Sequence, residues 1–259
     1  MAIPYEEYPR SDLLVQIVVQ FVFIFIIGIL LIWLVKKYAE KRVEEVKILL
    51  YFLILLEIST IAAWYPKILN YWAISTDWIY GFPVGGGRRL WWTNFSYIFN
   101  TMSSIYLIIF THLLFKIDKP RIIKIYILAV IGFNILSIYH GIFVYEPGAS
   151  SLTFPMSVYL ILLGTYSMGY LFWYTKRDLK KLSPSIYRFG YQMFYYATCL
   201  GLIAYFVWVL SIVLPVPKWA ASISWVINTF VMIFLSLGLT LPVWLRKWAA
   251  QRYSFDLNE

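Results

Sequence analysis

This sequence contains seven long apolar stretches, and its charged residues are concentrated in the segments between them. Each stretch is close to the ~20 residues that a helix needs to cross about 30 Å of hydrocarbon. Backbone polar groups in lipid must be satisfied within one helix or within a closed barrel. The stretches are much longer than the ~10-residue alternating strands of a barrel, so they indicate helices. The predicted helices span approximately residues 13–35, 48–73, 92–115, 122–145, 155–175, 190–214 and 219–245.

The composition supports an all-α polytopic membrane protein. Hydrophobic residues form 61% of the chain and charged residues only 14%, whereas soluble domains carry about a quarter charged residues. The first stretch is too long for a signal peptide and follows an acidic leader, so we predict a retained helix. We find no repeat and no soluble segment, and we therefore expect residues 1–259 to form a single transmembrane domain in a multi-pass protein of the cell membrane.

The charge distribution predicts the orientation. Seventeen of the 22 Lys and Arg residues fall on the side reached after the first, third, fifth and seventh stretches. Basic residues concentrate on the cytoplasmic side of membrane proteins, so we predict an outer N-terminus and a cytoplasmic C-terminus. We expect the basic face to meet anionic lipids, which accounts for the net charge of +9 without a nucleic-acid partner.

One carboxylate interrupts the second stretch, LLYFLILLEISTIAAWYPKI. Glu57 lies ten residues beyond Lys47, which corresponds to ~15 Å of helix and places it near mid-membrane. A charge at that depth costs several kcal/mol. Two interpretations stay open, a neutral carboxyl that bonds across helices and a site for an ion, a proton or a ligand.

Strong hydrogen-bonding side chains in other stretches are candidate partners for Glu57. Asn100, Asn134 and Asn228 are predicted within about a turn of mid-depth, where the four groups would form a polar core. Ser104 belongs to a polar row on the third stretch, whose members we interpret mainly as helix-packing contacts. The same interpretation applies to Ser222, Thr229 and Ser236 on the last stretch.

The predicted outer side is rich in aromatic residues. Trp64 and its neighbours are typical of an interfacial aromatic belt, and some of them could line an outward pocket for an apolar or cationic ligand. Arg88 and Arg89 follow three glycines in the second predicted outer segment. A flexible turn with interfacial arginines is the favoured interpretation, and a lid that attracts an anion is the alternative.

The sequence gives no reason to expect a cofactor, a metal or catalysis. The two histidines, His112 and His140, are predicted at opposite membrane faces, and Cys199 is the one cysteine. These residues do not supply the ligand set of a zinc or copper site. A single mid-membrane acid without a base or nucleophile is not an active site, so we predict that the protein is not an enzyme.

The topology resembles the seven-transmembrane sensing module that precedes histidine kinases, and the ending GLTLPVWLRKW resembles a last helix leaving the membrane. Microbial rhodopsins share the topology, but residues 219–245 contain no lysine for a retinal Schiff base. G-protein-coupled receptors share it too, but HLLFKIDKPR and GLTLPVWLRK stand where their signatures belong. The resemblance to the sensing module implies a stand-alone sensor that signals through a separate protein.

Three functions follow as hypotheses. The first is a receptor-like or sensory membrane protein with an outward aromatic pocket and a mid-membrane polar core. The alternative is a non-catalytic subunit of a larger membrane complex, with another membrane protein or a second copy as partner. The third is a small proton-coupled transporter with Glu57 as the coupling site.

Overall fold

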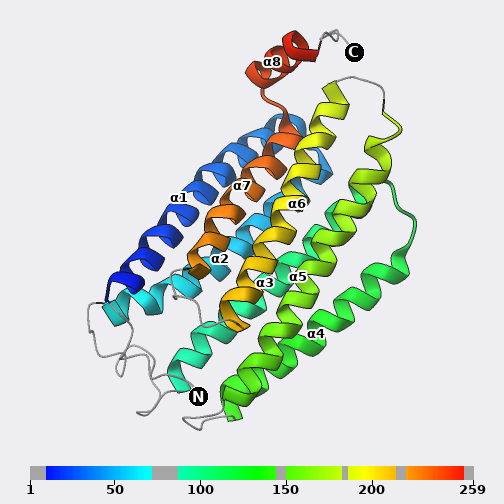
Figure 1. Ribbon diagram of the computed structural model, residues 1–259. Coiled ribbons are helices and arrows are strands. Elements are labelled where there is room, and N and C mark those ends of the chain that lie inside the picture. Colours follow the sequence, from blue (N-terminus) through cyan, green and yellow to red (C-terminus); the bar gives the residue numbers. More distant parts are fainter. Residues whose placement is uncertain (1–9, 72–86, 144–149, 183–185, 214–219, 254–259) are drawn as a thin grey trace.

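The computed structural model describes residues 10–71, 87–143, 150–182, 186–213 and 220–253. The described chain is all-α, as predicted, and its long helices run alternately up and down (Figure 1). The elements are α1 (Arg10–Lys41), α2 (Glu44–Tyr71), α3 (Gly87–Leu114), α4 (Pro120–Phe143), α5 (Ser150–Leu179), α6 (Ile186–Val213), α7 (Ala220–Thr240) and α8 (Val243–Tyr253).

Five of the described helices are long and apolar enough to cross a membrane. They are α1, α2, α3, α4 and α7, so a multi-pass membrane protein is supported. The two further predicted spans correspond to α5 and α6, which are rich in tyrosine.

The main core lies between α1, α2, α3, α5, α6 and α7. Its largest fully buried side chains are Phe23, Ile27, Leu34, Leu49, Leu53, Leu107, Phe110, Leu171, Phe194 and Leu235. α3 packs against α2, α4 and α5. α4 lies to one side, held to α3 and α5 by a smaller cluster around Phe133.

The last predicted span is interrupted. The sequence predicted one helix over residues 219–245, but α7 ends at Thr240 and α8 begins at Val243. Leu241 has a positive φ of 30°, and Pro242 has no N–H group with which to continue the helix. The apolar pattern runs through this break, which is why hydropathy alone overextended the helix.

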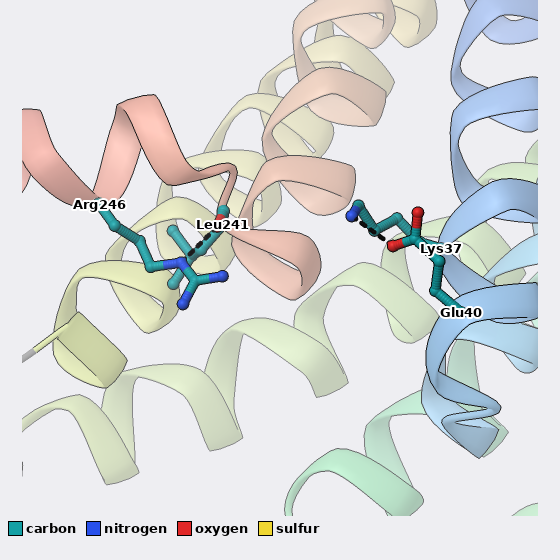
Figure 2. A network of polar contacts seen from close by, with 4 residues as sticks. All are labelled: Lys37, Glu40, Leu241 and Arg246. Carbon is teal, nitrogen blue, oxygen red and sulfur yellow. Dashed lines mark hydrogen bonds and ion pairs between the residues drawn. The ribbon is translucent and has the colours of Figure 1, made fainter. Parts of the chain in front are cut away.

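α8 is a separate element at the end of the bundle that also holds the α1–α2 junction (Figure 1). Leu245 and Ala249 pack against Phe189 at the start of α6. Arg246 Nε donates a hydrogen bond to the Leu241 carbonyl oxygen at 2.8 Å, and Lys37 pairs with Glu40 at 2.7 Å on α1 at the same end of the molecule (Figure 2). Short polar contacts therefore fix the helix ends where the basic residues gather.

Candidate functional site

Glu57 lies on α2 at the edge between the interior and the outer surface of the bundle. Its side chain is half-buried, with Leu53 and Thr60 buried on the inner side and Ile54 and Ile61 exposed on the outer side. Its Oε2 atom is buried and has no hydrogen-bond partner among the described residues. A buried polar group without a partner costs about 1–3 kcal/mol, so this oxygen is available to a group that the described residues do not supply.

The predicted partners of Glu57 make their bonds elsewhere. Asn134 on α4 accepts a hydrogen bond from Thr101 on α3, with 2.8 Å between Oγ1 and Oδ1. Asn100 contributes its backbone carbonyl oxygen, to which Ser103 donates at 2.6 Å. Asn228 is half-buried on α7. Within the described residues no hydrogen bond joins Glu57 to the three asparagines, although Asn100 lies on α3, which packs directly against α2.

Ser104 is part of a three-helix contact that the sequence did not reveal. The Tyr126 hydroxyl group on α4 lies 2.8 Å from Ser104 Oγ on α3 and 2.8 Å from the Leu163 carbonyl oxygen on α5. The Ser104 hydroxyl group in turn donates to the Thr101 carbonyl oxygen at 2.6 Å. All of this is buried, so Ser104 ties helices together and is not open to a ligand.

The Ser/Thr rows behave largely as packing positions. Ser222, Thr229 and Ser236 on α7 are all buried, and the Thr229 hydroxyl group donates to the Trp225 carbonyl oxygen of its own helix at 3.0 Å. Ser59 on α2 donates to the Ser96 carbonyl oxygen on α3 at 2.8 Å. Small polar residues let helices approach closely, and the burial of these side chains is consistent with that role.

The outer aromatic residue that we singled out, Trp64, holds α2 to α1. Its indole N–H donates to the Ile17 carbonyl oxygen at 3.0 Å, and its ring stacks on Phe21 with 5.8 Å between centroids. Arg88 and Arg89 begin α3, and their side chains lie outside the described residues.

A second polar pair lies close to Trp64, and sequence reasoning missed it. Lys67 Nζ on α2 donates to Gln20 Oε1 on α1 at 2.9 Å. Gln20 is 1% exposed, and its Nε2 atom has no partner among the described residues. The signal in the sequence was an amide inside the most apolar stretch together with a lysine inside the second predicted span.

His112 is a structural residue at the end of α3. Its Nδ1 lies 3.0 Å from the Ile117 carbonyl oxygen, and its Nε2 lies 3.0 Å from the Tyr170 hydroxyl group on α5. A carbonyl oxygen can only accept, so Nδ1 is the donor in the bond to Ile117, and Nε2 pairs with the Tyr170 hydroxyl group. His112 thus ties the α3–α4 turn to α5.

Comparison of the chain with family models, with curated proteins and with solved structures found no match. Among the described residues no three His, Cys, Asp or Glu side chains are grouped so as to hold a metal ion. The buried side-chain atoms that lack a partner among the described residues belong to Gln20, Glu57, Ser137, Ser222 and Ser236. Of these residues, Glu57 is ionisable and Gln20 contacts the Lys67 ammonium group, so a functional argument rests on these two.

Proposed function

We propose that this chain is a receptor-like membrane protein of the cell membrane with seven transmembrane helices, α1 to α7, an outer N-terminus and a cytoplasmic C-terminus. Ligand binding near Glu57 would change the packing of α1 and α2, and a separate partner protein would receive the signal. The observation that carries the proposal is the buried, unpartnered Oε2 atom of Glu57. An ionisable side chain at this depth is expensive for the fold, which is why such residues are commonly functional.

The test is a small-molecule screen for thermal stabilisation of the purified protein and of Glu57→Gln. A ligand that binds the folded state raises the unfolding temperature by mass action. We expect a donor-bearing compound to stabilise the wild type and to lose most of its effect on Glu57→Gln. A compound that stabilises both proteins equally would move the site away from Glu57, and a broad screen without any stabilising compound would count against a receptor.

A complex subunit is the second candidate, and one observation favours it. Glu57 is half-buried, and on α2 it stands next to Ile54 and Ile61, which are 39% and 44% exposed. A helix of another membrane protein could reach the carboxyl group across this surface and supply a hydrogen-bond donor. Mild-detergent extraction should then recover a second protein at a fixed ratio, and Glu57→Leu should release it.

A further inference from the structure

We propose that Lys67 and Gln20 form an oxyanion-binding site where α1 begins and α2 ends. The ligand class is a carboxylate or phosphate group, from either a soluble molecule or a lipid headgroup. The site is separate from Glu57, which lies ten residues away on α2, or ~15 Å along the helix. It is therefore independent of the function proposed above.

The first argument is an excess of hydrogen-bond donors. A lysine ammonium group has three N–H donors and no acceptor, and the structure gives Lys67 one acceptor, Gln20 Oε1. The Gln20 amide has two further donors on Nε2, and these have no acceptor among the described residues. The orientation of the amide is fixed, because only its oxygen can accept from Lys67. What would complement this pair is a group rich in acceptors.

The second argument is charge. The described ion pairs join Lys37 to Glu40, Lys47 to Glu44 and Arg177 to Asp178, and none of them includes Lys67. The nearest polar group to its ammonium is thus a neutral amide. An anion would complement this cation, because charges that lie partly out of water are stabilised by an opposite charge.

The third argument is access. Lys67 lies four residues before the described end of α2 at Tyr71, so it is near one end of the helix, closer to headgroups and solvent than a residue at mid-helix. Its own side chain is half-buried rather than closed off. Val18 and Phe21, on the turns of α1 around Gln20, are 51% and 52% exposed. A headgroup phosphate could reach Lys67 while its acyl chains lie on this apolar surface.

The experiment measures the unfolding temperature in a neutral detergent with sodium acetate, sodium phosphate or, at equal ionic strength, sodium chloride. At about ten times the dissociation constant, mass action predicts an increase on the order of 3 °C for the wild type. Lys67→Gln should lose this increase and Lys67→Arg should retain part of it. Lys47→Gln is the matched control, because Lys47 lies at the opposite end of α2 and pairs with Glu44 at 3.3 Å.

Gln20→Glu keeps the shape of the side chain and places a carboxylate beside Lys67. We expect this variant to fold, to unfold at a higher temperature than the wild type and to be insensitive to acetate and phosphate. A variant that still responds to the anions as the wild type does would overturn the site.

Native mass spectrometry separates the two sources of the oxyanion. If the wild type retains one phospholipid more than Lys67→Gln and ignores acetate and phosphate, the ligand is a headgroup phosphate. If the small anions act and the lipid count is unchanged, the ligand is soluble. If neither differs, water alone satisfies the pair and the proposal is wrong.

Discussion

Two kinds of polar side chain occupy the interior, and they differ in whether their bonds are complete. Tyr126, Thr101 and His112 have partners on neighbouring helices or turns and hold them together. Glu57 and Gln20 each keep a buried polar atom without a partner in the described structure. Natural folds satisfy nearly all buried polar atoms. A ligand or a partner protein could therefore form a hydrogen bond with the unpartnered atoms of Glu57 and Gln20.

Tyr126→Phe should reduce the stability of the protein. The substitution removes the hydroxyl group that reaches Ser104 on α3 and the Leu163 carbonyl oxygen on α5, so the polar contact that joins the three helices is lost. We expect a loss of about 1–2 kcal/mol, measured as an unfolding temperature lower by about 3–6 °C. Tyr187→Phe is the control, because Tyr187 is 62% exposed on α6. Equal effects of the two substitutions would show that the three-helix contact contributes nothing.

At the scale of the helix, close backbone approach distinguishes the α6–α7 pair. A Cβ atom added at Gly190 on α6 would lie 3.0 Å from the Gly238 carbonyl oxygen on α7, and one added at Gly238 would lie 3.0 Å from the Gly190 carbonyl oxygen. Both obstacles are backbone atoms, which cannot rotate away as a side chain can. The two glycines therefore let two helices approach where the hydrophobic effect gives no drive for their association in lipid.

Gly190→Ala should separate α6 from α7 and destabilise the protein by about 1–3 kcal/mol, the usual cost of overpacking. Gly169→Ala on α5 is the matched control, because an added Cβ atom there meets nothing within 4 Å. Alanine is the better helix former, so the control should be neutral or more stable by about 0.5–1 kcal/mol. Thermal unfolding of both variants measures the difference, and the same loss at both positions would point to helix flexibility instead of the α6–α7 contact.

At the scale of the whole molecule, successive helices run in opposite directions, so their connections lie at two ends of the bundle. α8 lies at one of these ends (Figure 1). Described basic residues from the α1–α2, α3–α4, α5–α6 and α7–α8 junctions gather at that end, among them Arg42, Lys119, Lys181 and Lys247. An anionic cytoplasmic leaflet would attract this end of the bundle.

The proposed orientation can be measured with single cysteines in a Cys199→Ser background. Ser11 and Asp118 are both exposed and lie near opposite ends of the bundle. We expect a membrane-impermeant maleimide to label Ser11→Cys on intact cells and to label Asp118→Cys only after the membrane is opened. The reverse pattern would place the basic end outside and contradict the proposed orientation.

The helices were predictable because long apolar runs allow few alternatives in lipid, and the predicted spans overlap α1 to α7. The side-chain partners were not. Depth along a helix follows from residue number, but the partner of a side chain does not, and Asn134 accepts from Thr101 and forms no bond with Glu57. The rotation of each helix and the choice of its neighbours depend on packing over the whole bundle, and a single sequence does not display them. The role of Gln20 was not predicted for the same reason. It depends on the hydrogen bond from Lys67, which lies on another helix.

The break at Leu241 and Pro242 also limits the length of α7, and helix length can be compared with the thickness of a bilayer. α7 has 21 residues, or about 31 Å of helix, whereas α1 has 32 residues and about 48 Å. A long helix accommodates a thick bilayer by sliding or tilting, but a short one exposes its ends or thins the lipid around it. The described part of α7 is therefore close in length to the ~30 Å thickness of a typical hydrocarbon layer, whereas α1 exceeds it.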